Sequence, residues 1–237
     1  MNQVALITGA SRGIGYAAAE YFAQKGYDLI LIARDENKLQ KAQQTLQSIN
    51  HNITIDYHSI DLAKPYEFET KIDAILQNKG RVDVVLNNAG ILITGLLDMS
   101  LEDFEKLNKI NVQSAFVLAR LAGQMMQQQG SGHILNLASM AGKRGLSGVG
   151  GYCSSKFAVV GMSESLYKAL APYNVKVTAI CPGMIDTDMT QVFDTPNDEK
   201  IKVDDIVVTI DYLLKLSPNA TMPSIDIQSQ SYVINNT

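Results

Sequence analysis

The sequence predicts an α/β protein: a doubly wound parallel β-sheet flanked by helices, in three α/β/α layers, within a single domain over residues 1–237. Short apolar runs rich in β-branched residues alternate with longer helical patterns, and this alternation favours right-handed crossovers between parallel strands. The apolar runs lack regular polar alternation, which is typical of strands buried on both faces. Ligands of such sheets bind at the carboxyl ends of the strands, so the residues that follow each strand are of most interest.

The first expected strand and helix meet at a glycine-rich turn. Val4–Ile7 is an apolar run of strand length, and Gly13–Lys25 places its apolar residues on one helix face before Gly26 ends it. Leu29–Ala33 is a second apolar run, and Glu36–Ile49 has the pattern of a helix with a polar face. The alternation continues with a strand at Ile53–Tyr57, a helix at about Pro65–Asn78 and a strand at Val82–Leu86.

The second half of the chain keeps the same alternation. Ser100 is expected to cap a helix, and Asp103 completes an imperfect capping box three residues later. The helical pattern then continues, with breaks, up to the next apolar run. The remaining expected elements are a strand at His133–Leu137, a helix at Ser154–Leu170, a strand at Val175–Ile180, a helix at Val203–Leu216 and a last strand at Ser224–Gln228.

Composition excludes several classes of partner. The charges are interspersed and sum to −4, so the chain offers no basic stripe for nucleic acid. No apolar stretch reaches membrane-spanning length, and the first residues do not resemble a signal peptide. Cys153 and Cys181 sit among apolar residues, and His51, His58 and His133 are scattered, so we expect buried thiols and no metal site. A reducing, cytoplasmic location fits this composition.

The turn after the first strand has the residue types of a phosphate-binding loop. It reads Thr8-Gly9-Ala10-Ser11-Arg12-Gly13-Ile14-Gly15 and opens directly into a helix. Glycines let the backbone approach a pyrophosphate, which then lies at the helix N-terminus. The spacing differs from the general G-x-G-x-x-G pattern, and a tight strand–helix turn without a ligand would look similar, so the context of a strand before and a helix after carries the prediction.

A serine, a tyrosine and a lysine carry the predicted chemistry. Ser139 follows the fifth expected strand, and Tyr152 and Lys156 stand four residues apart, on one face of a helix. A phenol of pKa about 10 is a poor acid–base group at neutral pH, whereas a nearby ammonium would lower that pKa. A Tyr-x-x-x-Lys pair alone is common on solvated helix faces. A serine at a strand end of this fold makes catalysis the better interpretation.

Three further segments are candidates by position. Asn87-Asn88-Ala89-Gly90 follows the fourth strand with small residues that suit a flat ligand, and Pro182-Gly183 forces a turn after the sixth. Asn111 lies inside a helical pattern, where its side chain competes for backbone hydrogen bonds and could simply bend the helix. Each of these segments could be a plain structural feature when considered alone.

In this order, the motifs resemble those of the short-chain dehydrogenase/reductase family, in its shorter, non-extended branch. The resemblance covers Val4 to about Leu216 and implies a Rossmann-like fold and an NAD(P)(H)-dependent oxidoreductase acting on a small-molecule carbonyl or alcohol. It implies that Tyr152 is the acid–base residue, that Ser139 bonds the same substrate oxygen, and that Lys156 holds the nicotinamide ribose and lowers the Tyr152 pKa. Asn111 would anchor a water in a proton relay.

The resemblance also implies a set of cofactor-binding residues. The pyrophosphate and its ribose would lie on the glycine turn, adenine beside the residues after the third strand, and nicotinamide beside the Pro-Gly turn. The implied residues are Gly9, Ser11, Arg12, Gly13, Ile14, Gly15, Arg34, Asp61, Leu62, Asn87, Ala89, Gly90, Tyr152, Lys156, Pro182, Gly183, Ile185 and Thr187.

Residues at the end of the second strand favour NADP(H) over NAD(H). An NAD-type site needs a carboxylate there, and Ala33 cannot supply it. Arg34 and Arg12 can instead bind the 2′-phosphate dianion through their guanidinium groups. Asp35 is close to the position of an NAD-type acid, but the chain is already leaving the strand, so we expect its side chain to point outward.

The sequence leaves the substrate open. The expected pocket comprises Ile91–Leu97, Gly142–Gly151 and Met184–Phe193, in which Lys143 and Arg144 are the basic candidates for an acidic substrate, although both are expected to be solvated. The tail over residues 217–227 departs from the Val-Asp-Gly-Gly-like ending common in the family. That departure weakens the assignment as a 3-oxoacyl-carrier-protein reductase and leaves small hydroxy acids and other ketones or aldehydes open.

The same residues bear on other possible functions and on the assembly state. Extended-branch epimerases and dehydratases resemble a Gly-x-x-Gly-x-x-Gly turn with a longer C-terminal region, which this chain does not match. A non-catalytic nucleotide-sensing or scaffold protein remains the alternative, because fold alone does not prove function. A homodimer or homotetramer is expected from apolar residues on the helices that form the family's main interface, namely Phe116, Leu121, Met125 and Met126.

Overall fold

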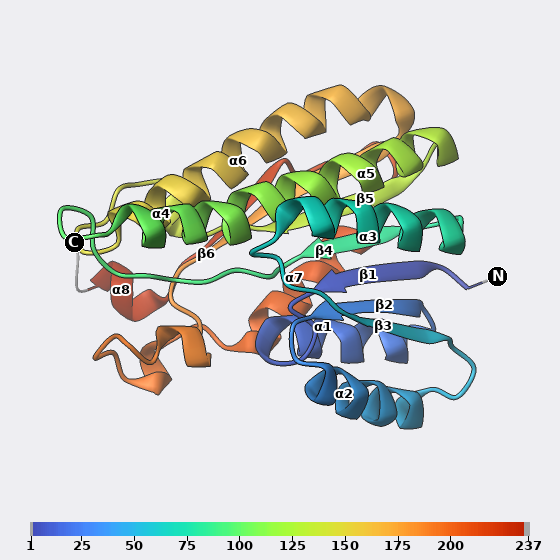
Figure 1. The fold of residues 1–237 in the computed structure, drawn as a ribbon, viewed down its shortest axis with the longest axis horizontal. Coiled ribbons are helices and arrows are strands. Elements are labelled where there is room, and N and C mark those ends of the chain that lie inside the picture. Colours follow the sequence, from blue (N-terminus) through green and yellow to red (C-terminus); the bar gives the residue numbers. More distant parts are fainter. Residues whose placement is uncertain (1, 235–237) are drawn as a thin grey trace.

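The computed structural model describes residues 2–234 and contains one parallel sheet of seven strands in the order β3-β2-β1-β4-β5-β6-β7 (Figure 1). All its pairings are parallel, as the alternation of strands and helices predicts. The strands are β1 (Val4–Thr8), β2 (Asp28–Ala33), β3 (Ile55–Ser59), β4 (Val84–Asn87), β5 (Gly132–Leu137), β6 (Val175–Pro182) and β7 (Ser224–Ile227).

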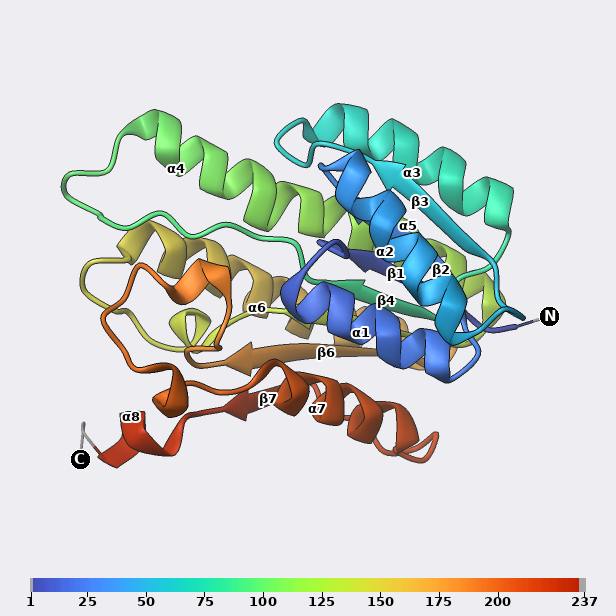
Figure 2. The same ribbon diagram turned by 90° about the horizontal axis from the view of Figure 1, so that it is seen from below.

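Helices cover both faces of the sheet, which confirms the three-layer architecture (Figures 1 and 2). On one face lie α1 (Gly13–Gln24), α2 (Glu36–Ile49) and α7 (Val203–Lys215). On the other lie α3 (Pro65–Lys79), α4 (Leu101–Leu107), α5 (Ser114–Gln129) and α6 (Gly150–Leu170), and a short α8 (Gln230–Ile234) follows β7. Over the described part of the chain, no helix combines the length and apolar character needed to cross a membrane.

The strand residues pack alternately into two cores, which explains why the strands lack a polar face. Ala5 and Ile7 pack with α1 and α7 on one side of the sheet, whereas Val4 and Leu6 pack with α3 and α5 on the other. Successive side chains of a strand point to opposite faces, so a sheet covered on both faces needs apolar residues at every position.

The expected elements are all present, and the main differences lie at their ends. The last strand pairs with β6 as β7, so the tail forms a strand despite its unusual sequence. The helix expected to start at Ser154 starts at Gly150. Gly150 and Gly151 have low helix propensity, so the sequence does not predict this first turn, and tertiary contacts stabilise it instead. Gly151 lies against the Met99 side chain and donates its N–H to the Gly95 carbonyl at 3.4 Å.

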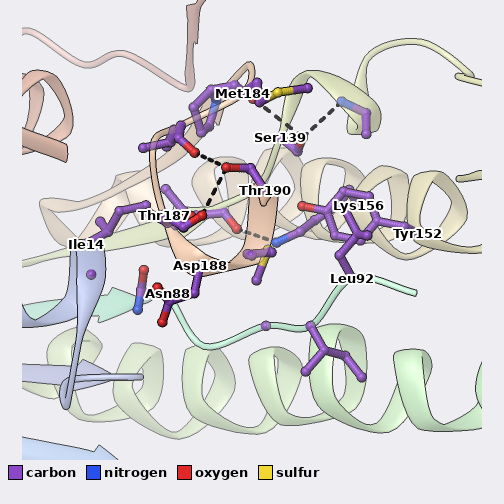
Figure 3. A pocket seen from close by; sticks show the side chains of 18 of the residues that line it. Ile14, Asn88, Leu92, Ser139, Tyr152, Lys156, Met184, Thr187, Asp188 and Thr190 are labelled. Atoms are coloured by element: carbon purple, nitrogen blue, oxygen red, sulfur yellow. Dashed lines mark hydrogen bonds between the residues drawn. The ribbon is translucent and has the colours of Figure 1, made fainter. Parts of the chain in front are cut away.

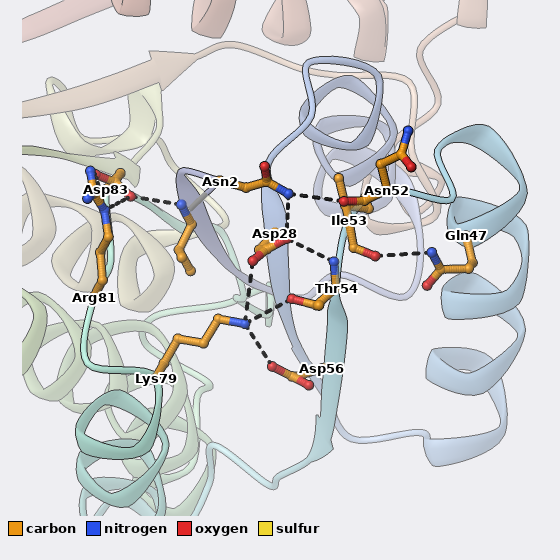
Figure 4. Close-up of polar contacts among 11 residues, drawn as sticks. Asn2, Asp28, Gln47, Asn52, Ile53, Thr54, Asp56, Lys79, Arg81 and Asp83 are labelled. Carbon is orange, nitrogen blue, oxygen red and sulfur yellow. Dashed lines mark hydrogen bonds and ion pairs between the residues drawn. The ribbon is translucent and has the colours of Figure 1, made fainter.

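Ion pairs and hydrogen bonds fasten the sheet at the amino ends of its strands (Figure 4). The Asp28 carboxylate accepts from the Thr54 N–H at 2.8 Å and from Asn2 Nδ2 at 3.1 Å. The Asp83 carboxylate accepts from the Val4 N–H at 2.8 Å and pairs with Arg81 at 2.7 Å. These groups lie at the opposite end of the sheet from the glycine turn and leave the carboxyl ends open for a site.

The strand order reverses at β1, whose neighbours are β2 and β4. The chain builds β1, β2 and β3 outward in one direction and then returns to place β4 on the other side of β1. The connections that leave the carboxyl ends of β1 and β4 therefore diverge to opposite faces. Such a switch point creates the crevice in which ligands of open α/β sheets bind.

Candidate active site

A cavity of about 1140 Å³ lies at the carboxyl ends of the strands and contains most of the expected site residues (Figure 3). It is lined by the loops after β1, β2, β4, β5 and β6 and by the start of α6. The expected residues that line it are Gly9, Ser11, Arg12, Gly13, Ile14, Arg34, Asp61, Leu62, Ala89, Gly90, Ser139, Tyr152, Lys156, Pro182, Gly183, Ile185 and Thr187.

Three expected site residues lie outside the cavity wall. Asn87, predicted to line the cofactor, does not line the cavity: its buried amide donates to the Ala115 carbonyl at 2.9 Å and to Asn136 at 3.2 Å, and its contact with a cofactor stays a prediction. Its neighbour Asn88 lines the cavity instead. Gly15 is packed behind the wall, where an added Cβ would overlap the Gly9 carbonyl oxygen. Asn111 is the third residue outside the cavity wall.

The glycine turn is held against the loop after β4. Gly9 has a positive φ of 68°, and an added Cβ would come within 2.6 Å of Asn88 Nδ2, so the position requires glycine. The Thr8 hydroxyl accepts from the N–H groups of Asn88 and Ala89, each at 3.0 Å. These contacts fix the start of α1 beside the cavity, where its free N–H groups can bind an anion.

Ser139, Tyr152 and Lys156 meet at the ends of β5 and α6 (Figure 3). The Ser139 hydroxyl accepts from the Ala141 N–H at 3.1 Å and donates to the Pro182 carbonyl at 3.4 Å, which fixes it at the cavity wall. Lys156 Nζ donates to the Leu137 carbonyl at 2.8 Å and lies 5.7 Å from the centroid of the Tyr152 ring. The expected serine, phenol and ammonium are therefore brought together.

The electrostatics of the pair differ from the expectation. Burial raises the pKa of the Tyr152 phenol to about 12, and hydrogen bonding by Ser139 offsets this only in part. Burial also lowers the pKa of the Lys156 ammonium to about 8. Lys156 is not among the groups that lower the Tyr152 pKa. The protein therefore holds Tyr152 as a neutral phenol at neutral pH, ready to donate a proton.

Asn111, which does not line the cavity, connects the loop after β4 to α6 through its side chain. Its side chain accepts from the Ile91 N–H at 2.8 Å and donates to the Ile91 carbonyl at 2.9 Å and to Ser155 Oγ at 3.1 Å. It lies within the π-helical turn Asn108–Gln113, between α4 and α5. The expected bend is thus a local widening of the helix, a feature frequent at functional sites. An added Cβ on Gly90 would meet both Asn111 Oδ1 at 3.3 Å and Lys156 Nζ at 3.7 Å, so these two groups flank the same small residue.

Charged residues gather at the end of the cavity beside β2. Arg12 and Arg34 both line it, and Arg12 Nη1 lies 2.6 Å from Asp188 Oδ2. Asp35 also lines the cavity, and its carboxylate caps α2 by accepting from the Lys38 N–H at 3.0 Å. Lys38 adds a third cation to the wall, which sequence analysis missed because it lies on an otherwise polar helix face.

The other end of the cavity, around Tyr152, is mainly apolar. The loops after β4, β5 and β6 contribute the side chains Leu92, Leu146, Val149, Met184 and Phe193. Lys143 points away, since its ammonium bonds Ser224 Oγ at 2.9 Å and pairs with Asp226 at 3.4 Å. Arg144 lines the cavity and donates to Gln228 Oε1 at 3.2 Å, so it is less solvated than expected.

Two residues support the site in ways that the sequence does not reveal. Thr8 holds the loop after β4, and Ser155 receives the Asn111 amide while donating to the Tyr152 carbonyl at 2.7 Å. Both have short hydroxyl side chains, and only the tertiary structure reveals their partners. Within residues 2–234, no group of three or more His, Cys, Asp or Glu side chains could hold a metal ion.

Comparison with known proteins gives a consistent result along the chain. A family model described as short chain dehydrogenase matches residues 3–198. An uncharacterized oxidoreductase of Staphylococcus epidermidis is 30% identical over 228 residues, which are 96% of this chain and 97% of that protein.

Solved structures agree with the sequence comparison. A β-ketoacyl-[ACP] reductase from Bacteroides thetaiotaomicron superposes with a TM-score of 0.85 at 34% identity and covers 99% of both chains. An alcohol dehydrogenase from the archaeon Thermococcus sibiricus, complexed with 5-hydroxy-NADP, has a TM-score of 0.88 at 29% identity and covers 97% of both chains.

Proposed function

Because the chain belongs to the short-chain dehydrogenase/reductase family of oxidoreductases, we propose that it is an NADP(H)-dependent enzyme that reduces an uncharged ketone or aldehyde, or oxidises the matching alcohol, with Tyr152 as the acid–base residue. The observation that carries the proposal is the meeting of Ser139, Tyr152 and Lys156 in the cavity that also contains the glycine turn. A non-catalytic nucleotide-binding protein would not need this arrangement.

The residues of the cavity fit a dinucleotide. Gly9 and Gly13, both with positive φ, line the cavity without side chains, and the start of α1 presents free N–H groups there. Small residues continue along Ala89 and Gly90 to the Pro-Gly turn after β6. Asp61 and Leu62 would hold the adenine, and Lys156 the nicotinamide ribose. The bound nicotinamide supplies or accepts the hydride, and this chain's own residues orient the reactants and handle the proton.

Proton transfer belongs to Tyr152. During reduction, the Ser139 and Tyr152 hydroxyls donate hydrogen bonds to the substrate oxygen, and negative charge develops on that oxygen. Tyr152 then transfers its proton to the oxygen, as a group with a raised pKa and a neutral resting form can do. Lys156 and the Asn111 side chain flank Gly90 behind the phenol, so a water between them would return the proton from solvent.

The charge at the end of β2 supports the preference for NADP(H). Arg12, Arg34 and Lys38 all line the cavity there, and their positive charges would bind a 2′-phosphate dianion. The similar alcohol dehydrogenase complexed with 5-hydroxy-NADP also supports this choice. Asp35 could serve an NAD-type site, but its carboxylate is turned to the Lys38 N–H of its own helix.

The apolar wall around Tyr152 supports an uncharged substrate. Leu92, Leu146 and Phe193 surround the phenol end of the cavity, and an apolar substituent gains about 25 cal/mol for each Å² that they remove from water. Lys143, a basic candidate for an acidic substrate, is engaged by Asp226 on β7. A small hydroxy acid or an acyl group on a carrier protein is therefore a less suitable substrate than a simple hydrophobic ketone.

Two measurements on the purified protein test the proposal. The first follows NADPH absorbance with a panel of ketones matched in size, with and without a carboxylate; we expect turnover to be highest for the uncharged apolar members. The second compares kcat/KM for NADPH and NADH in the wild type and in Arg12→Ala/Arg34→Ala. Two charge-assisted contacts should favour NADPH by at least about tenfold and the double variant should lose that preference. Binding of both nucleotides without any turnover would instead support the non-catalytic alternative.

A further inference from the structure

An ion pair crosses the cofactor end of the cavity between segments far apart in the chain. Arg12 precedes α1 in the glycine turn. Asp188 follows Thr187 in the loop after β6 (Figure 3). Arg12 Nη1 and Asp188 Oδ2 are 2.6 Å apart, and both residues line the cavity. The pair therefore engages one of the two arginines that are expected to bind the 2′-phosphate.

The Arg12–Asp188 ion pair is weak enough for a phosphate to replace Asp188 as the partner of Arg12. The side chains of Arg12 and Asp188 are 64% and 66% exposed, and ion pairs between such exposed groups are weak. A phosphate dianion carries more charge than a carboxylate and matches the guanidinium fork equally well, so it competes effectively for the same group. NAD(H) lacks that phosphate and would leave the ion pair in place.

Resting on the proposed NADP(H) dependence, we propose that Asp188 is a positioning residue that tempers the cofactor preference by holding Arg12 and so competing with the 2′-phosphate for its guanidinium. A second base–acid pair supports this view, because the Lys38 ammonium lies 3.8 Å from the Asp35 carboxylate at the same end of the cavity. The cations that would bind the 2′-phosphate are thus partly neutralised in advance, which narrows the difference in affinity between the two cofactors.

The alternative role for the pair is a latch that closes over any bound dinucleotide. A latch would stabilise NADPH and NADH complexes equally, because both contain the pyrophosphate and the nicotinamide ribose. Competition acts on NADPH alone. The ratio of the two dissociation constants therefore separates the roles, whereas the affinity for either cofactor alone would not.

The experiment measures dissociation constants of NADPH and NADH by calorimetry, without substrate, for the wild type, Asp188→Asn, Arg12→Gln and the double variant. We expect Asp188→Asn to bind NADPH about two- to fivefold more tightly, the range of an exposed ion pair, with NADH unchanged. In the Arg12→Gln background, Asp188→Asn should leave the ratio of the NADPH and NADH dissociation constants unchanged, because the guanidinium for which Asp188 and the 2′-phosphate compete is absent.

Asp186→Asn is the matched control. Asp186 lies two residues earlier in the same loop, lines the same cavity and pairs with Lys202 at 3.1 Å rather than with Arg12. Removing its charge should change the affinity for both cofactors by the same factor. Asp188→Ser serves as a second variant at the position, and thermal melting checks that each variant is folded.

Three results would overturn the inference: equal weakening of both cofactors in Asp188→Asn, an unchanged ratio in that variant, or the same gain in the Arg12→Gln background. The proposed cofactor preference is judged separately, by the ratio in the wild type. A wild type without preference that gains one in Asp188→Asn, and only with Arg12 present, would refute the proposed NADP(H) preference and support the role of Asp188.

Discussion

Tyr152 is a buried phenol at the cavity wall, and its hydroxyl is the group that would exchange a proton with substrate. Tyr152→Phe keeps the ring and its packing and removes only that oxygen. We expect turnover to fall by about 10²–10⁴-fold, the usual contribution of general acid–base catalysis, with NADPH affinity nearly unchanged. Steady-state kinetics and cofactor titration of the same preparation measure the two effects.

Tyr167→Phe is the control for this substitution. Tyr167 lies on the same helix, α6, but it packs partly buried against the core and does not line the cavity. Its variant should keep wild-type turnover. If Tyr152→Phe retained more than about a tenth of the wild-type kcat, another group would have to supply the proton.

The raised pKa of Tyr152 makes the two directions of the reaction differ in their dependence on pH. Reduction needs the neutral phenol, and a pKa of about 12 keeps that form fully populated from pH 6 to 9. Oxidation needs the deprotonated form. At pH values below the pKa, the population of this form increases about tenfold for each unit by which the pH is raised. We therefore expect kcat for reduction to stay flat over this range and kcat for oxidation to rise throughout it. A plateau for oxidation near neutral pH would show that the pKa in the working enzyme is much lower.

At the scale of elements, Asp83 joins β4 to β1 at the end of the sheet opposite the site. Its buried carboxylate accepts from the Val4 N–H at 2.8 Å, and Val4 is itself buried. Asp83→Ala would leave this N–H without an acceptor inside the protein, which costs about 1–3 kcal/mol of unfolding free energy. Urea denaturation should show that loss, while kcat stays near the wild-type value because the site lies at the other end of the strands.

Asp83→Asn separates the hydrogen bond from the ion pair. The amide oxygen can still accept from the Val4 N–H, whereas the bidentate pairing with Arg81 loses its charge. We expect a smaller loss of stability than for Asp83→Ala, since a part-exposed ion pair contributes little. Equal losses in the two variants would mean that the pairing with Arg81, and not the hydrogen bond, accounts for the effect.

The sequence predicts the elements that depend on local patterns. It does not predict features that depend on tertiary contacts. The strand β1 and the turn after it follow from an apolar run and the glycines, and Ser100 caps α4 as expected, with the Asp103 N–H donating at 3.0 Å. The start of α6 was misplaced because Gly150 and Gly151 are poor helix formers that packing alone makes helical.

The same distinction applies to the candidate site. Tyr152 and Lys156 were predictable because their helical spacing combines with a serine, Ser139, at a strand end of this fold. The orientation of the Asn87 amide was not, since its partners, Asn136 and the Ala115 carbonyl, come from β5 and α5. The pKa of Tyr152 was predicted in the wrong direction, because the sequence shows a neighbouring charge but not the depth of burial.

At the scale of the whole molecule, apolar residues remain exposed on α5 and α6, two of the helices that cover one face of the sheet. Of the four residues expected at an interface, Met126 is fully buried in the core and Leu121 and Met125 pack partly buried against it. Phe116 on α5 is 50% exposed, and Phe157 on α6 is 46% exposed. Helices α5 and α6 lie side by side (Figure 1), so we expect the two phenylalanines to share one surface formed by these helices.

We predict that this surface is the interface of a homodimer. Large aromatic side chains are enriched at the centres of interfaces, and a partner that covers Phe116 and Phe157 removes their apolar area from water. Phe116→Glu/Phe157→Glu would place carboxylates opposite each other across the two-fold axis, so light scattering at micromolar concentration should change from at least a dimeric mass to that of a single chain. Val208→Glu is the control, because Val208 is 67% exposed on α7, on the opposite face of the sheet, and its variant should remain at least dimeric. A monomeric wild type, or a double variant that keeps the wild-type mass, would contradict the prediction.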